Sequence, residues 1–277
     1  MRTADFFEQN PVFGHSEFVA AHTSDGRSEF TSNNLLAKHL ASGRLLRVRR
    51  GLYAVVPRGV DPDKAQVDPY LLASRLTDDA VVAYHAALQF HGKAYSLWQR
   101  FHYLTAKRAR PFSFRAMEFI PVTVPGPVCT LPEWGGGLLK ANHAGGQAKV
   151  AGLERTLVDV LDKPEKCGGW EEIWRSLEMV EFFDLDEVIS FALALNKSLT
   201  IARVGFFLEQ HQDSLMVVEK HLEPLRKKAP KQPRYFDGTR TLGKLVSEWN
   251  LIVPESVLER RWEEVAYIRS ANNRYFS

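Results

Sequence analysis

The chain has 277 residues, of which 45% are hydrophobic, so it is long enough for two domains that each bury a core. This composition excludes disorder over most of its length. The formal charge of +3 is too small to indicate a nucleic-acid-binding protein by itself, so the distribution of charge has to carry that argument.

Positive charge is concentrated in the first half of the chain. Residues 1–60 hold eight Lys and Arg against five Asp and Glu, and residues 80–117 hold six against none. Residues 161–200 reverse the balance, with nine acids against four bases. The two cysteines are far apart, which excludes a cysteine-rich zinc site or disulfide scaffold. With no apolar run near ~20 residues and no signal-peptide pattern, we expect a cytoplasmic protein.

The chain starts with two predicted short helices, at residues 3–13 and 15–22, followed by a turn at Asp25-Gly26-Arg27. Residues 31–43 then predict a third helix of about three turns. At 100° per residue, its apolar and its small or polar residues fall on opposite arcs: Leu35, Leu36, His39 and Leu40 against Asn34, Ala37, Lys38 and Ala41. We expect Thr31 or Ser32 to cap this helix and Gly43 to end it.

An alternating pattern follows the third helix. Leu46 and Val48 alternate with Arg47 and Arg49, and Arg50-Gly51 predicts a tight turn into a second extended run. The result is a two-stranded ribbon with arginines at its tip. The predicted order is two helices, a turn, a third helix and a ribbon. This is the order of a winged helix-turn-helix, which we expect to span residues 1–57.

A helix whose outer residues are small fits the major groove, where Asn pairs with adenine and Lys with guanine or phosphate. The predicted base-reading residues are Ser32, Asn33, Asn34 and Lys38, and the residues predicted at phosphates or the minor groove are Arg47, Arg49 and Arg50. Two alternatives stay open. Winged helices also bind proteins, and a basic hairpin can be a solvated edge strand.

The segments VFGHSEFVAAH and LAKHLASGRLLRVRRGLYAVVP resemble the N-terminal domain of the AbiEi family, the antitoxins of type IV toxin-antitoxin systems. VVAYHAALQFHGKA, GLERTLVDVLDKPEKCGG and LVSEWNLIVPESVLERRW are similar to landmarks of its longer members. The resemblance implies a winged domain that binds double-stranded promoter DNA upstream of its own operon. It also implies a C-terminal domain that counteracts a co-encoded nucleotidyltransferase toxin, with no direct complex required.

Residues 58–68 are rich in proline and aspartate and predict a linker, so residues 69–277 would form the second domain. Helices are predicted at residues 70–76 and 81–90, and extended segments at residues 101–105 and 119–131, where the prolines suit edge strands. Glycines at residues 135–137 and 145–146 predict turns. Further helices are predicted at residues 152–161 and, as a bundle, between residues 168 and 208. An exposed basic loop at residues 221–236 and closing helices at residues 241–249 and 254–267 complete the prediction.

Basic and aromatic residues alternate between residues 93 and 115, where no acid occurs. The bases are Lys93, Arg100, Lys107, Arg108, Arg110 and Arg115. They form either a second nucleic-acid or antitoxin surface, or the solvated side of strands whose aromatic residues face a core. Glu154 and Arg155 are candidates for an antitoxin surface, although the pattern favours a solvated ion-pair face.

We therefore expect an α+β protein, with an N-terminal winged helix-turn-helix followed by a larger mixed α+β domain that holds a small sheet and a helical bundle. Pro62-Asp63 and Lys64 lack the second acidic-x-Lys pair that a nuclease would place on a nearby strand, and the histidines lack the spacing of zinc ligands. We expect no catalysis, metal or cofactor. The alternatives are a stand-alone regulator of a phage-defence or mobile-element locus, an enzyme acting on nucleic acid, and a protein-binding scaffold.

Overall fold

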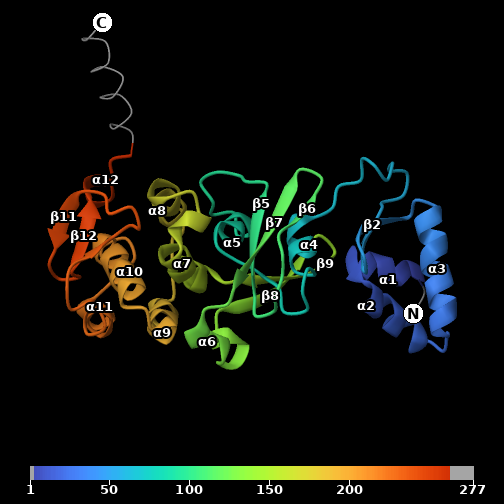
Figure 1. The fold of residues 1–277 in the computed structure, drawn as a ribbon, viewed down its shortest axis with the longest axis horizontal. Helices are drawn as coiled ribbons and strands as arrows, with labels where there is room; N and C mark the ends of the chain where they lie inside the picture. Colours follow the sequence, from blue (N-terminus) through green and yellow to red (C-terminus); the bar gives the residue numbers. More distant parts are fainter. Residues whose placement is uncertain (1–2, 263–277) are drawn as a thin grey trace, which may run out of the picture. The chain divides into compact units, whose positions relative to one another are not determined.

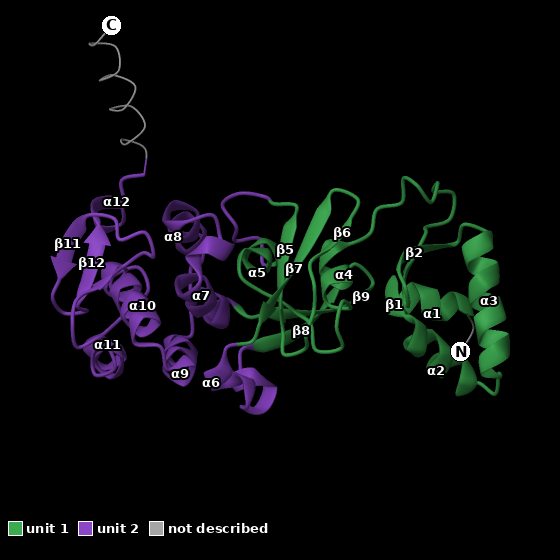
Figure 2. Cartoon of the chain, viewed as in Figure 1, with its two compact units in different colours: residues 1–90, 98–124, 138–152 green, residues 91–97, 125–137, 153–277 purple. Residues whose placement is uncertain are grey.

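The computed structural model describes residues 3–262, which form two compact units (Figures 1 and 2). Unit 1 comprises residues 3–90, 98–124 and 138–152, and unit 2 comprises residues 91–97, 125–137 and 153–262. Both units contain helices and strands, so the expected mixed α+β class is confirmed. No helix within residues 3–262 is long and apolar enough to cross a membrane.

The first part of unit 1 contains three helices and a three-stranded antiparallel sheet. Its elements are α1 (Thr3–Gln9), β1 (Val12–Gly14), α2 (His15–Thr23), α3 (Glu29–Ala41), β2 (Leu45–Arg49) and β3 (Leu52–Val55). The strand order is β1-β3-β2. Four phenylalanines build the core together with residues of α3, β2 and β3: Phe6, Phe7, Phe13, Phe18, Leu36, Leu45 and Tyr53. Strand β1 was not predicted, because three residues are too few to show a period.

The third helix begins two residues earlier than predicted. Its cap is Ser28, whose side-chain oxygen accepts a hydrogen bond from the backbone N–H of Thr31 at 3.1 Å. Thr31 and Ser32 therefore lie in the first turns of the helix, and their prediction as caps was wrong. The predicted end is confirmed by Gly43, whose φ of +69° is the left-handed conformation that favours glycine.

The rest of unit 1 is a six-stranded mixed sheet with two short helices. Its elements are α4 (Pro69–Ala73), β4 (Val81–Val82), α5 (His85–Phe90), β5 (Arg100–Thr105), β6 (Phe112–Phe114), β7 (Met117–Thr123), β8 (Leu138–His143) and β9 (Gly146–Ala151). The strand order is β6-β7-β5-β4-β9-β8, with parallel pairing of β5 with β7 and of β4 with β9.

This sheet is larger than the small one expected. The helix predicted at residues 81–90 is divided, because Val81 and Val82 form β4 and pair with β5 and β9. Glycine turns were predicted correctly around residue 145, but the strands on either side of that turn were not. Strand β6 pairs with β7 only as far as Phe119. Pro121 comes two residues later, where β7 is no longer paired with β6. Its position agrees with the edge-strand pattern predicted.

Unit 2 is mainly helical. Its elements are α6 (Gly126–Cys129), η1 (Pro132–Gly135), α7 (Leu153–Asp162), η2 (Pro164–Lys166), α8 (Trp170–Glu178), α9 (Leu185–Leu195), α10 (Ser198–Gln210), α11 (Glu219–Arg226), β10 (Arg234–Tyr235), β11 (Gly243–Val246), β12 (Leu251–Pro254) and α12 (Glu255–Glu259). Helix α7 packs against α9 and α10, which agrees with the predicted bundle. The strands form a sheet in the order β10-β12-β11.

Two secondary-structure predictions in unit 2 were wrong. The segment expected to be an exposed loop at residues 221–236 contains α11 and β10, because Leu222 and Leu225 are fully buried even though Pro224 lies between them. The segment expected to be a helix at residues 241–249 contains β11. Its apolar anchor is confirmed, since Trp249 is buried directly against the backbone of Gly205, where an added Cβ would lie 2.1 Å from the indole ring. Residues 263–267 of the last predicted helix lie outside the described part.

Arg155, which was predicted to lie with Glu154 on an exposed face of α7, is in fact buried, whereas Glu154 is half-buried. Arg155 is 0% exposed and Asp159 1%, and Nε of Arg155 donates to Oδ2 of Asp159 at 3.3 Å. Nη1 of Arg155 donates to the carbonyl oxygens of Trp134 and Gly136 at 3.0 and 2.9 Å. Arg155 therefore binds the 3₁₀ turn η1 to α7 and is not part of a surface.

Candidate nucleic-acid interface

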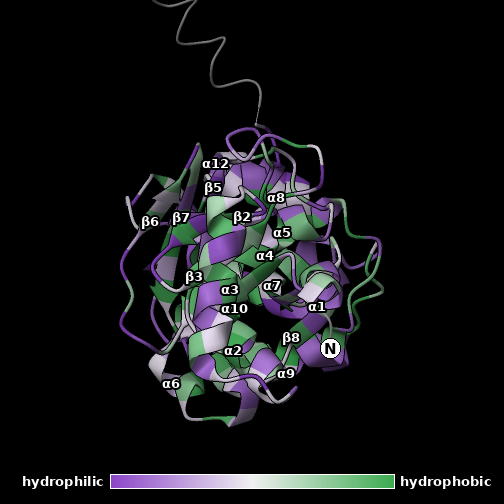
Figure 3. Cartoon of the chain, turned by 90° about the vertical axis from the view of Figure 1, so that its right-hand side faces the viewer, coloured by the Kyte–Doolittle hydropathy of each residue, from purple (hydrophilic) through white to green (hydrophobic). Residues whose placement is uncertain are grey.

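Helix α3 has one face in the core and one face in water, as its periodicity predicts. Leu36 is 4% exposed and belongs to the phenylalanine core, whereas Asn34, Ala37, Lys38 and Ala41 are exposed. In Figure 3, which looks onto α3, this helix carries both hydrophilic and hydrophobic residues toward the viewer. The outer face therefore offers an amide, an ammonium group and small side chains together.

The two other predicted base-reading residues differ in accessibility. Ser32 is 0% exposed, and its hydroxyl donates to the carbonyl oxygen of Ser28 at 3.1 Å. Ser32 therefore cannot contact a base, and that prediction was wrong because the helix starts earlier than expected. Asn33 is exposed, with Oδ1 located 2.7 Å from Nε2 of His15 at the start of α2. This hydrogen bond orients the Asn33 amide beside the outer face of α3.

The arginines of the β2–β3 hairpin also fall into two groups. Arg47 and Arg50 are exposed, and Gly51 adopts a φ of +77° in the turn between the strands. Arg49 is half-buried: its guanidinium donates to the carbonyl oxygen of Leu76 and lies 5.7 Å from the centre of the Phe112 ring. Arg47 and Arg50 are therefore available to a polyanion, while Arg49 holds the hairpin against the six-stranded sheet.

His39 lies near the end of α3. Its side chain is half-buried against the core, with its ring centre 5.1 Å from that of Phe7. Burial lowers the pKa of His39, and the positive charges of Arg44 and Lys38 lower it further. The imidazole is therefore held neutral, and Lys38 is the cation of the outer face.

The basic residues between positions 93 and 115 are divided between the two units, and four of them are engaged in contacts within their own unit. Lys93 belongs to unit 2, where its Nζ donates to the carbonyl oxygen of Met179 at 2.9 Å. In unit 1, Arg100 pairs with Glu118 at 2.9 Å, Lys107 pairs with Asp78, and Arg115 donates to the carbonyl oxygens of Ala65 and Pro62.

Arg108 and Arg110 differ from these four bases. Both are exposed in the β5–β6 loop (residues 106–111), and neither has an ion-pair partner among residues 3–262. Of the aromatic residues in this region, Phe101 and Tyr103 are 2% and 1% exposed in β5. In β5, therefore, the aromatic residues face the core, as the second of the two alternatives predicted.

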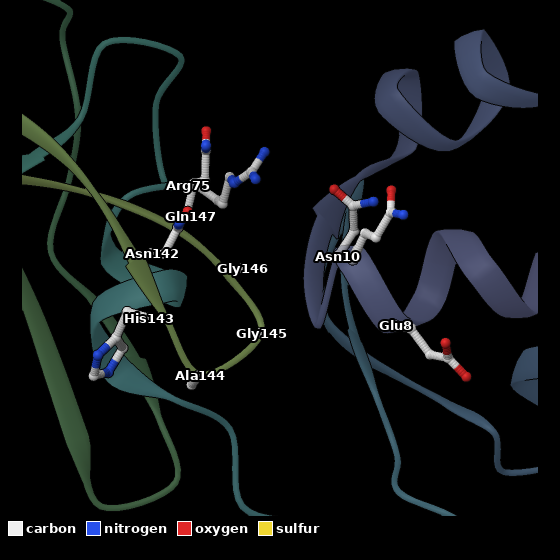
Figure 4. Close-up of a pocket in the computed structure, with 10 residues that line it drawn as sticks. Glu8, Asn10, Arg75, Asn142, His143, Ala144, Gly145, Gly146 and Gln147 are labelled. Carbon is white, nitrogen blue, oxygen red and sulfur yellow. The ribbon is translucent and has the colours of Figure 1, made fainter.

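A polar cleft of about 630 Å³ lies within unit 1. It is lined by Arg75 and the β8–β9 turn on one side and by Glu8 and Asn10 on the other (Figure 4). Two of its polar side chains are engaged in contacts within unit 1, because Arg75 pairs with Glu17 and His143 lies 2.8 Å from Asp68. Within residues 3–262, no group of three or more His, Cys, Asp or Glu is placed to hold a metal ion. We therefore assign no ligand to the cleft.

Phe30 is an exposed apolar residue of α3 that the sequence pattern did not single out. It is 76% exposed, one residue after the start of the helix. The signal was present in the sequence, because Phe30 precedes Asn34, Ala37 and Ala41 by four, seven and eleven residues, which is the spacing of one helix face. It was missed because the helix was expected to begin at Thr31.

Comparison with known protein families and with curated proteins finds no match for this chain. Among solved structures, the chain is similar to that of the RV2827C protein from Mycobacterium tuberculosis, with a TM-score of 0.58 and 17% sequence identity. The match covers 93% of this chain and 91% of the other. The two proteins share a fold. At this identity, the likeness carries no function from one to the other.

Proposed function

We propose that residues 3–57 form a winged helix-turn-helix that binds double-stranded DNA upstream of the protein's own operon and represses it. The observation that carries the proposal is the arrangement of exposed groups. Asn34 and Lys38 stand on the outer face of α3, and the exposed Arg47 and Arg50 stand on the hairpin that follows it. The resemblance to the AbiEi family supports the same proposal.

In the proposed complex, α3 enters the major groove. The Asn34 amide is suited to the edge of adenine, and the Lys38 ammonium to guanine or a phosphate. Arg47 and Arg50 neutralise backbone phosphates beside the groove, which contributes affinity without reading sequence. Arg49 stays at the carbonyl oxygen of Leu76 and keeps the hairpin in place.

The test of this proposal is a gel-shift titration of the full chain on the DNA directly upstream of its gene. We expect a sequence-preferring shift that weakens with salt and is lost in the variant Arg47→Ala/Arg50→Ala. Arg100→Ala is the matched control, because Arg100 is exposed but paired with Glu118. A wild-type protein that shifts unrelated DNA equally well, or a double variant that binds as tightly, would overturn the repressor proposal.

We further propose that the same chain is an antitoxin of a type IV system and counteracts a nucleotidyltransferase toxin encoded beside it. This part is supported by the resemblance of residues 81–94, 152–169 and 245–262 to the longer AbiEi members. In a strain with the neighbouring gene induced, we expect both the full chain and Arg47→Ala/Arg50→Ala to restore growth. If neither restores growth, the protein is a stand-alone regulator.

A further inference from the structure

The outermost stripe of α3 is mostly apolar. At 100° per residue, Phe30, Asn34, Ala37 and Ala41 fall within an arc of about 60°, and all four are exposed. Phe30 is 76% exposed, so most of its ring is in water. An exposed aromatic ring of this kind costs solvation free energy, which is recovered when a partner covers it.

The charges around this stripe indicate the chemistry of that partner. Lys38 lies next to the stripe on α3, and Arg47 and Arg50 are exposed on the following hairpin. The acid of the first turn, Glu29, is about 100° away from Phe30 around the helix. A polyanion that also offers apolar groups complements such a surface. Double-stranded DNA does so in its major groove, where each thymine presents a C5 methyl group.

We propose that Phe30 packs on thymine methyl groups in the major groove and thereby selects thymine-containing sites. This inference rests on the proposed DNA binding by α3 and adds a specificity-determining contact to it. Asn34, one turn further along the same stripe, is positioned to read the adenine of a neighbouring base pair. Together the two residues favour a site in which A·T pairs occupy adjacent steps.

Removing the methyl group from the DNA tests this contact without altering the protein. The fragment directly upstream of the gene is amplified once with thymidine and once with deoxyuridine triphosphate, which leaves base pairing intact. Burying one methyl group is worth about fourfold in affinity. We therefore expect the full-length wild-type chain to bind the uracil fragment at least fourfold more weakly than the thymine fragment.

The variant Phe30→Ala separates this contact from the rest of the interface. We expect it to bind thymine DNA about as weakly as the wild type binds uracil DNA, and to distinguish the two fragments much less. Phe30→Leu keeps an apolar side chain and should retain most of the preference. Leu97→Ala is the control, because Leu97 is 83% exposed in unit 2 and should leave both affinities unchanged.

Three outcomes would overturn the inference, and they are distinguishable. Wild-type binding that is tight but equal on both fragments contradicts the thymine contact and leaves the proposed repressor function standing. Loss of affinity in Phe30→Ala with an unchanged preference for thymine assigns Phe30 to another contact, such as a second copy of the chain. Failure of the wild type to bind either fragment contradicts the proposed function itself.

Discussion

Arg155 has no exposed side-chain surface, and its charge is balanced by Asp159 one helical turn away. Burial raises the pKa of Asp159, and the positive charge of Arg155 opposes that rise. A helical wheel places both residues outside the apolar arc of α7. It fails here because α9 and α10 pack on this helix and leave little of its surface free.

Replacing Arg155 with Met should lower the free energy of unfolding by about 3–5 kcal/mol, because it leaves the Asp159 carboxylate buried without its partner. The double variant Arg155→Met/Asp159→Leu should regain much of that loss. Lys227→Ala is the control, since Lys227 forms an ion pair with Glu223 at the same spacing but in water. Urea unfolding followed by tryptophan fluorescence measures all three. A single variant as stable as the control would contradict the buried-pair account.

His39 introduces a pH dependence into the candidate interface. Its pKa in the folded chain is lowered, first by burial and then by Arg44 and Lys38, so the unfolded chain binds the proton more tightly. Stability of the α3 region should therefore be constant at high pH and decrease as the pH falls below about 6.5, the unfolded value. Hydrogen exchange of α3 amides, corrected for intrinsic rates, should show this decrease in the wild type. The same decrease in His39→Gln would exclude His39 as its cause.

At the scale of elements, strongly periodic segments were predicted correctly, whereas very short strands and segments that depend on tertiary packing were not. The helix at α3 and the ribbon of β2 and β3 follow from their hydrophobic periods, and Trp249 is the anchor expected. Strand β4 has two residues, which cannot display an alternation. Helix α11 contains a proline, and it is stabilised by buried leucines that only tertiary packing reveals.

The β5–β6 loop should add phosphate contacts to the interface. Phe112, which directly follows this loop, lies against Arg49 of the β2–β3 hairpin, so the loop that carries Arg108 and Arg110 ends next to the hairpin. Each phosphate neutralised contributes about −0.9 to the slope of log affinity against log salt. We expect Arg108→Ala/Arg110→Ala to make this slope shallower by about 1.8, without changing the preferred sequence. An unchanged slope would exclude the loop from the complex.

At the scale of the molecule, each compact unit is assembled from three separate stretches of chain. Sequence composition placed a linker at residues 58–68, and that domain boundary stays a prediction. Composition could not show that residues 3–57 belong to the same compact unit as the six-stranded sheet. The contacts of Arg49 with Leu76 and of Arg75 with Glu17 join these two parts. Such contacts join residues far apart in the chain, and no local pattern encodes them.

The candidate interface was predictable where it depends on one helix and one hairpin. Asn34, Lys38, Arg47 and Arg50 followed from period and charge, and each is exposed as expected. Ser32 and Arg49 were misjudged because their accessibility depends on a helix start and on a neighbouring sheet. Phe30 was missed because the start of the helix was placed after it. Accessibility is the property that a single sequence conveys least well.

The central claim is that this chain binds its own upstream DNA through α3 and the β2–β3 hairpin. The most direct measurement is the salt dependence of that affinity, for the wild type and for Arg47→Ala/Arg50→Ala. We predict that log affinity falls linearly with log salt and that the double variant loses about two units of slope together with most of its affinity. A wild-type slope near zero, or the same slope in both proteins, would contradict the claim.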